Sequence, residues 1–183
     1  MGADKAVHVC DPALHGSDAL VTSAVLAAAL SRTGFDLVIC GSESTDARTG
    51  MLPAMLAERL SLPQLSFASW VETDGQRIGI RRLADYGYDT VEASLPAVVS
   101  VVEKINEPRY PSFKGIMAAK KKPVEVLTLA DLGLDPVTAG LAASATQVTG
   151  FSARPARQAG TIVVDEGRGG IGAAEFLAVR KFI

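Results

Sequence analysis

The chain of 183 residues is 48% hydrophobic and 21% charged, and its 18 Lys and Arg residues nearly balance 20 Asp and Glu residues. This composition is typical of a packed protein and excludes a disordered chain and a basic nucleic-acid-binding surface. The longest apolar run, ALVTSAVLAAAL, is shorter than the about 20 residues that a membrane span needs, so no membrane insertion is expected.

The chain begins with a predicted strand, helix and strand. Residues 6–10, AVHVC, form an apolar run typical of a buried strand. Helical spacing follows from Ser17, a candidate N-cap, to Arg32, and Gly34 stands where a helix stops. Residues 35–40, FDLVIC, are apolar on both faces, as buried parallel strands are. The sequence therefore predicts a βαβ unit in a mostly parallel α/β sheet.

A polar loop and several β-rich segments come next. The loop GSESTDARTG, residues 41–50, leads into a predicted helix over 53–60. Asp74-Gly75 predicts a β-hairpin, and residues 88–102 supply further strand. These segments are expected to extend the parallel sheet as antiparallel strands.

The rest of the chain predicts an extension. We assign residues 1–135 to the α/β domain and residues 136–183 to an extended arm and a closing helix. In chain order, VEVLTLADLGL predicts a strand followed by a turn, and residues 136–160 predict an extended arm. Residues 161–165 then predict a strand, and residues 173–182 predict a closing helix.

The strongest candidate site is the loop after FDLVIC. In open α/β sheets ligands bind beyond the carboxyl ends of the strands, where backbone N–H groups and a helix N-terminus attract anions. Arg48 adds a positive charge to this loop. Its small polar residues can cradle a phosphate: Ser42, Ser44, Thr45, Thr49 and Gly50. A plain surface loop is the alternative.

Other motifs carry little chemistry. GRGGIG, residues 167–172, matches the dinucleotide pattern, but a dinucleotide fold needs a further strand and an acidic residue about 20 positions on, so we interpret it as a turn into a docking helix. His8 and His15 have no triad or metal spacing. Glu43 and Asp46 are interpreted as solvated loop carboxylates rather than an acid/base pair. No metal site is expected.

The two cysteines, Cys10 and Cys40, lie in apolar runs. They are interpreted as reduced core residues of a cytoplasmic protein.

The segment NEPRYPSFKGIMAAKKKP, residues 106–123, combines an apolar stretch with a Lys triplet. Three lysines are fewer than a membrane-binding cluster contains, and cations suit a helix C-terminus. At helical spacing Phe113, Ile116 and Met117 share one face with Tyr110 nearby, which is either core or a face that docks on a partner.

Three stretches resemble the β subunit of electron-transfer flavoprotein: DLVICG, LPAVVSVVEKINEPRYPSFKGIMAAKKKPVEV and DLGL. The resemblance covers the whole chain and is firmest from Phe35 to Leu134. It implies an adenine-nucleotide-binding fold of the Rossmann-like, universal-stress type, with an added hairpin and a C-terminal arm that wraps an α subunit. The heterodimer holds one FAD, mostly on the α subunit, and carries electrons from dehydrogenases such as acyl-CoA dehydrogenases towards the respiratory chain. The β subunit holds a structural AMP, or a second FAD in electron-bifurcating relatives, and makes no substrate bond itself.

The resemblance also implies a nucleotide site. The matching positions are Cys40, Gly41, Ser42, Ser44, Thr45, Asp46, Thr49, Gly50, Met51 and Leu52. Met51 replaces a Gln that is typical of the family, which removes a polar contact, and Pro53 removes a backbone donor.

Residues 106–123 match the family's recognition loop, which anchors the β subunit on a dehydrogenase. The implied docking residues are Tyr110, Phe113, Ile116, Met117 and Lys121. The anchor, usually Leu, is here the bulkier Phe113, so partner choice is expected to differ. Ala118 replaces one of two lysines that are methylated in some members, and Lys121 is the other.

The family's β subunit has a strand and further elements before the position of Met1. The sheet is therefore expected to lack at least one strand, leaving an exposed edge and a half-built nucleotide site. Two alternatives remain: a stand-alone adenine-nucleotide-binding module of the universal-stress type, and a hydrolase or lyase on the same fold.

Overall fold

The computed structural model describes residues 2–157, 160, 162 and 164–183. They form two compact units, Met1–Gln147 and Val148–Ile183. The first unit contains β1 (Ala6–Val9), η1 (Pro12–Leu14), α1 (Ala19–Thr33), β2 (Leu37–Gly41), α2 (Leu52–Leu60), β3 (Gln64–Thr73), β4 (Arg77–Ala84), β5 (Gly87–Ser94), β6 (Ala97–Val101), α3 (Phe113–Ala119), β7 (Val124–Leu127), η2 (Ala130–Leu132), η3 (Pro136–Thr138) and α4 (Gly140–Ala143); the second contains α5 (Gly169–Val179).

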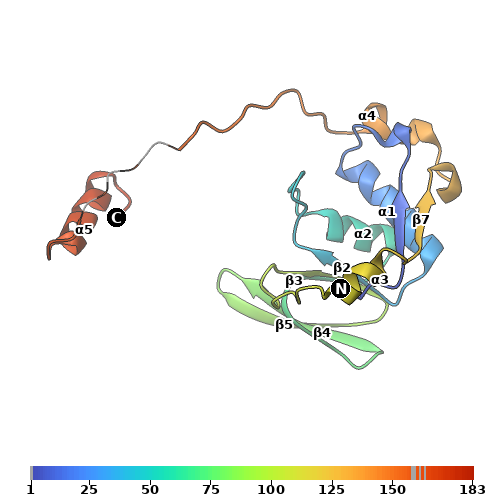
Figure 1. Ribbon diagram of the computed structural model, residues 1–183, viewed down its shortest axis with the longest axis horizontal. Helices are drawn as coiled ribbons and strands as arrows, with labels where there is room; N and C mark the ends of the chain where they lie inside the picture. Colours follow the sequence, from blue (N-terminus) through green and yellow to red (C-terminus); the bar gives the residue numbers. More distant parts are fainter. Residues whose placement is uncertain (1, 158–159, 161, 163) are drawn as a thin grey trace. The chain divides into compact units, whose positions relative to one another are not determined.

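The strands of the first unit form two separate sheets (Figure 1). One consists of β1 and β7, which run parallel, and the other has the order β2-β6-β3-β4-β5. In the larger sheet β2, β6 and β3 are parallel, while β4 and β5 are added in antiparallel register. The α/β class with antiparallel additions is confirmed. The prediction that β1, α1 and β2 form a βαβ unit of one sheet is not met in the described residues, because β1 and β2 fall in different sheets.

Local signals placed most elements correctly. The hairpin at Asp74-Gly75 joins β3 and β4, where the Asp74 carboxylate accepts hydrogen bonds from the Gln76 and Arg77 N–H groups and Gly75 has a φ of 90°. Gly34 ends α1, and its N–H donates to the Leu30 carbonyl. The N-cap of α1, however, is Asp18 and not Ser17.

The correction at Ser17 has a structural reason. The Ser17 hydroxyl accepts a hydrogen bond from the Gly140 N–H at 3.0 Å and donates to the Leu14 carbonyl, so it joins two loops. The Asp18 carboxylate accepts from the Val21 N–H and also from the Ala145 and Thr146 N–H groups. These bonds, the one from Val21 first, lower the pKa of Asp18. Asp18 therefore fastens residues 145 and 146 to the start of α1.

This contact explains where the first unit ends. The helices η3 and α4 belong to this unit, which runs to Gln147 and so extends beyond residue 135, the boundary expected from the sequence. Their packing is close: a Cβ on Gly140 would overlap the Ala13 carbonyl oxygen, and one on Gly16 would lie 2.8 Å from the Leu141 Cβ. The extended arm predicted from residue 136 begins only after α4.

Helix α1 lies along both sheets. Val21 and Val25 form a buried cluster with Leu129 and Ala139, against which Val9 of β1 packs. Leu30, near the other end of α1, packs against a second buried cluster. This cluster consists of Val38 of β2, Ala57 of α2 and Val98 of β6. The third cluster lies within the larger sheet and consists of Leu65, Ala68, Ile78, Ile80, Ala97 and Val99.

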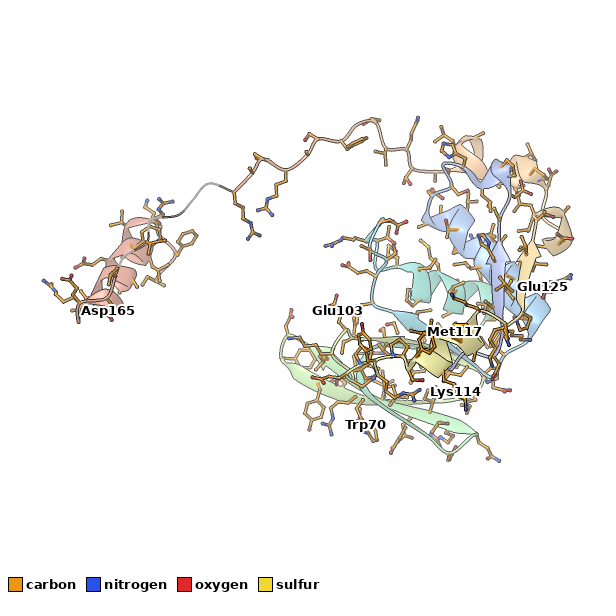
Figure 2. The ribbon with its side chains drawn as sticks, viewed as in Figure 1. Trp70, Glu103, Lys114, Met117, Glu125 and Asp165 are labelled. Atoms are coloured by element: carbon orange, nitrogen blue, oxygen red, sulfur yellow. The ribbon has the colours of Figure 1, made fainter. Side chains whose placement is uncertain are left out.

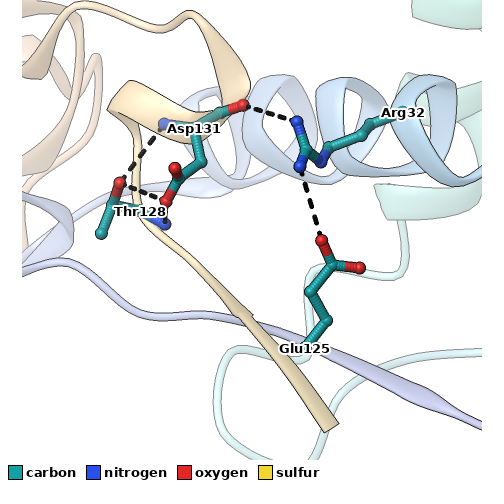
Figure 3. A network of polar contacts seen from close by, with 4 residues as sticks. All are labelled: Arg32, Glu125, Thr128 and Asp131. Carbon is teal, nitrogen blue, oxygen red and sulfur yellow. Dashed lines mark hydrogen bonds and ion pairs between the residues drawn. The ribbon is translucent and has the colours of Figure 1, made fainter. Parts of the chain in front are cut away.

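Polar contacts fix the C-terminal end of α1 to the smaller sheet (Figure 3). The Arg32 guanidinium donates to the Asp131 carbonyl at 3.2 Å and forms an ion pair with Glu125 of β7 at 3.5 Å. The Asp131 carboxylate in turn accepts from the Thr128 N–H and hydroxyl. These exposed contacts orient α1, and as surface interactions each contributes little stability.

The second unit contains a turn and the closing helix. The Asp165 carboxylate accepts hydrogen bonds from the Gly169 and Gly167 N–H groups, at 2.7 and 2.8 Å, in the turn that precedes α5, whose N-cap residue is Arg168. The predicted strand over 161–165 falls partly outside the described residues, at positions 161 and 163, and Ile162, Val164 and Asp165 are not in a strand.

Gly140 and Gly133 provide a matched test of the junction at η3 and α4. Both have φ near 70°, which costs an L-residue about 1 kcal/mol, but a Cβ on Gly133 meets no atom within 4 Å. We expect Gly133→Ala to lower the free energy of unfolding by about 1 kcal/mol and Gly140→Ala by about 2–4 kcal/mol, because the added methyl overlaps backbone. Urea unfolding measures both, and equal losses would contradict the close contact.

Candidate functional site: the loop after β2 and the helix α3

The predicted phosphate loop runs from the end of β2 to the start of α2. Cys40 and Gly41 are the last residues of β2, and Leu52 is the first residue of α2. The Ser42 hydroxyl donates to the Val101 carbonyl at 2.9 Å and so ties the loop to the end of β6. The loop therefore lies beyond the carboxyl ends of two adjacent parallel strands, where ligands of open α/β sheets bind.

Side chains within the loop shape its turn. The Ala47 N–H donates to the Asp46 carboxylate at 2.8 Å and to the Ser44 hydroxyl at 3.4 Å. A hydrogen bond with Ser44, followed by the one from Ala47, lowers the pKa of Asp46. Arg48 and Gly50 have φ values of 50° and 63°. Asp46 therefore serves the turn as a charged hydrogen-bond acceptor.

The start of α2 has no side-chain cap. Its N-cap residue is Met51, and Pro53 in the first turn is buried and has no N–H. Uncapped N–H groups at a helix N-terminus carry partial positive charge. Residues 43–51 are all exposed, while Cys40, Ser42 and Leu52 are half-buried. The predicted nucleotide residues thus lie along one continuous loop that is open on its outer side.

The two cysteines differ from the prediction. Cys10 is exposed, so its interpretation as a core residue is wrong; it follows the end of β1, and its N–H donates to the Leu127 carbonyl. Cys40 is only half-buried, and desolvation raises the pKa of its thiol.

Helix α3 presents the predicted docking residues to solvent. Its N-cap is Ser112, whose hydroxyl accepts a hydrogen bond from the Gly115 N–H at 3.1 Å. No residue of α3 is buried, and Phe113 is 80% exposed. Tyr110, Ile116 and Met117 are exposed too, and Figure 2 shows Met117 and Lys114 on this helix. The face at 113–117 is therefore not part of the core, which was one of its two interpretations.

Residues around α3 complete this surface. A hollow of about 400 Å³ is lined by Pro111, Gly115, Ile116, Ala119 and Lys120. Pro111, Gly115 and Ala119 were not predicted from the sequence, because their side chains carry no charge or polar group that indicates a binding site. Lys122 forms an ion pair with Asp4 at 2.9 Å, and Lys120 stands at the C-cap of α3, where a cation suits the helix dipole.

A second exposed surface was missed. The Arg81 guanidinium lies 4.7 Å from the centre of the Tyr88 ring, and Trp70, opposite Arg81 in the ladder, is exposed on the same sheet. Figure 2 labels Trp70 on the sheet of β3, β4 and β5. Strand periodicity could have placed these side chains on one face, since residues paired across a ladder share a face.

The glycine-rich turn has an internal partner for its N–H groups. The Asp165 carboxylate occupies the Gly167 and Gly169 N–H groups, and these bonds, Gly169 first, lower the pKa of Asp165. Within the described part of the second unit no strand precedes α5. The N–H groups of Gly167 and Gly169 are thus engaged within the turn itself.

The fold and the loop define an α/β protein with a polar, anion-compatible loop beyond its parallel strands. A family model, "Electron transfer flavoprotein domain", matches residues 1–132. The β subunit of electron transfer flavoprotein from Mycobacterium tuberculosis (strain H37Rv) is 52% identical over 184 residues, which cover all of this chain and 69% of the relative. The chain therefore belongs to the electron-transfer flavoprotein β-subunit family.

Two further relatives are more distant in sequence. The β subunit from Clostridium acetobutylicum is 34% identical over 163 residues, or 89% of this chain and 63% of the relative. A caffeyl-CoA reductase-Etf complex subunit, CarD, from Acetobacterium woodii is 34% identical over 164 residues, with the same coverage of 89% and 63%.

Among the described helices, none is long and apolar enough to cross a membrane.

The reaction rates of the two cysteine thiols test their difference in burial. At pH 8 we expect a thiol reagent to modify Cys10 at least about ten times faster than Cys40, because burial restricts access to Cys40 and reduces its thiolate fraction. The variants Cys10→Ser and Cys40→Ser assign the two phases. Loss of the fast phase in Cys40→Ser would contradict the predicted order.

Proposed function

We propose that this chain is the β subunit of a heterodimeric electron-transfer flavoprotein that passes electrons from dehydrogenases towards the respiratory chain. The similarity to β subunits over all 183 residues carries this proposal. In it the chain is a binding and docking subunit with no substrate chemistry of its own. FAD lies mostly on an α subunit, which this chain helps to enclose, and residues 148–183 form the arm that packs on that subunit.

The loop after β2 is the proposed nucleotide site. It would hold the phosphate of AMP, with backbone N–H groups at the start of α2 and the Arg48 side chain as the positive groups. Uncapped α2 and the exposed loop support this assignment. Glu43 and Asp46 in the same loop limit its positive charge, so backbone groups rather than net charge must select the anion.

The helix α3 is the proposed docking element for a dehydrogenase of the acyl-CoA class. Hot-spot residues of interfaces are large and enter pockets, and Phe113 is the largest exposed apolar side chain of α3. The relative CarD is named as a subunit of a caffeyl-CoA reductase complex, so enzymes acting on CoA thioesters include both dehydrogenases and reductases as candidate partners.

Co-expression with an electron-transfer flavoprotein α subunit tests the function. We expect a yellow heterodimer that contains one FAD, and native mass spectrometry of this complex distinguishes AMP, a second FAD or no ligand at the loop. The M. tuberculosis β subunit, expressed with the same α subunit, is the positive control. If that control forms a flavin-containing complex and residues 1–183 do not, the proposal is wrong for this chain.

Phe113 tests the docking element separately. In the heterodimer we expect Phe113→Ala to slow electron transfer from an acyl-CoA dehydrogenase about tenfold or more, since an anchor residue is worth about 2 kcal/mol. FAD content and the unfolding midpoint should not change, because Phe113 is 80% exposed. Tyr86→Ala, at a position that is 78% exposed, is the matched control. A lower unfolding midpoint or an equal effect of the two variants would contradict docking through Phe113.

A further inference from the structure

One carboxylate ties the segment that leaves the first unit to the start of α1. The Asp18 Oδ1 atom accepts a hydrogen bond from the Val21 N–H at 3.1 Å and so caps α1. The Oδ2 atom accepts from the N–H groups of Ala145 and Thr146, at 2.8 and 3.1 Å. A single side chain therefore serves two parts of the fold, although 127 positions separate Asp18 from Ala145.

A serine contributes a bond in the opposite direction. The Ser144 hydroxyl accepts a hydrogen bond from the Asp18 N–H at 2.9 Å and donates to the Gly16 or the Gly140 carbonyl, each at 2.9 Å. The short helix α4 therefore lies against the loop that enters α1 (Figure 1). Residues 144–146 are bound both to the backbone and to the carboxylate of Asp18.

The C-terminal arm begins directly after this contact. Within the described part of the chain, residues 147–157 belong to no helix or strand, and all of them are exposed. Among the described residues, the next hydrogen bonds along the chain are those that the Asp165 carboxylate accepts inside the second unit. The point at which the arm leaves the first unit is therefore fixed at residues 144–146.

We propose that the contact between Asp18 and residues 144–146 is a latch that positions the arm, residues 148–183, for binding to the α subunit. The latch holds the first residues before the arm in place in the free chain. Ordering them only on binding would lower the affinity, because fixing flexible backbone opposes association. This inference rests on the proposed heterodimer and assigns Asp18 to it as a positioning residue.

The latch needs a carboxylate, whereas the helix cap does not. An Asn side chain has one acceptor oxygen, which suffices to cap α1, and Asn is as good an N-cap as Asp. Its NH2 group cannot accept hydrogen bonds from the Ala145 and Thr146 N–H groups. Asp18→Asn therefore opens the latch and keeps the cap, while Asp18→Ala removes both.

Asp11 provides a matched control. Its Oδ1 atom accepts from the Ala13 N–H at 3.0 Å and caps η1, and its Oδ2 atom accepts from the Leu129 N–H at 3.2 Å. Asp11 thus also joins a helix cap to a segment 118 positions away, and its bonds do not involve residues 144–146. Asp11→Asn removes a bond of the same kind outside the latch.

Amide hydrogen exchange of the free chain is the first test. In Asp18→Asn we expect the N–H groups of residues 145 and 146 to exchange at least about ten times faster, because they lose their acceptor, and the capped Val21 N–H to exchange as before. Asp11→Asn should change the exchange at Leu129 and leave residues 145 and 146 as they are. Unchanged exchange at residues 145 and 146 in Asp18→Asn would overturn the latch.

Affinity for an electron-transfer flavoprotein α subunit is the second test. We expect Asp18→Asn to raise the Kd of the heterodimer at least about tenfold, and Asp11→Asn to bind like the unchanged chain. The two variants should have the same unfolding midpoint, so a merely structural role of Asp18 predicts equal Kd values for both. Asp18→Ala should unfold at a lower midpoint than Asp18→Asn, because it also loses the helix cap.

The result with the unchanged chain separates this inference from the proposed function. If the unchanged chain binds no α subunit while the M. tuberculosis β subunit does, the proposed function is wrong and the positioning role fails with it. If the unchanged chain binds and Asp18→Asn binds equally tightly, the proposed function stands and only the positioning role is wrong.

Discussion

The first unit depends on one buried helix, α1, which contacts both sheets and the helix α2. The Arg59 side chain of α2 donates to the Ser23 hydroxyl at 2.8 Å and to the Leu20 carbonyl at 3.0 Å. Ser23 is fully buried, and its hydroxyl also donates to the Leu20 carbonyl at 2.8 Å, so it is hydrogen-bonded both as donor and as acceptor. Because β1 and β2 share no hydrogen bonds, packing on α1 holds their sheets together.

The composition of α1 suits this position. Its buried residues alternate along the sequence, Val21, Ser23, Val25, Ala27 and Ala29, so the helix is covered on more than one side. Small side chains at Ser23, Ala27 and Ala29 allow a neighbouring helix to approach closely. A helix that is apolar on most sides is buried on most sides, which is why the sequence there has no clear polar face.

Much of the fold follows from local signals, but the pairing of strands does not. Gly34, Pro53 and Asp74-Gly75 act within a few residues, and each marks an element boundary that the structure contains. Val7 and Glu125 are paired although they lie in the first and last strands of the first unit, far apart in the sequence. An apolar run records that a strand is buried and not which strand lies beside it. Cys10 was misjudged for the same reason, since its exposure depends on an edge that no local pattern reveals.

The candidate site shows the same division between local and long-range information. The loop after β2 was predictable, because a polar strand-to-helix connection is visible in the residues themselves. Its openness was not predictable from those residues, because it depends on what lies beside β2. The Ser42 hydroxyl ties the loop to β6 through the Val101 carbonyl, and within the described residues β2 pairs with no strand on its other side.

The position of α3 follows from the connectivity of the chain. Residues 102–123 join β6, in the larger sheet, to β7, in the smaller one, and α3 lies within this connection. Segments that connect elements run over the surface of a protein, and the exposure of Phe113, Ile116 and Met117 on α3 has this origin. The apolar pattern of the helix is visible in the sequence, whereas its exposure depends on the two strands that it connects.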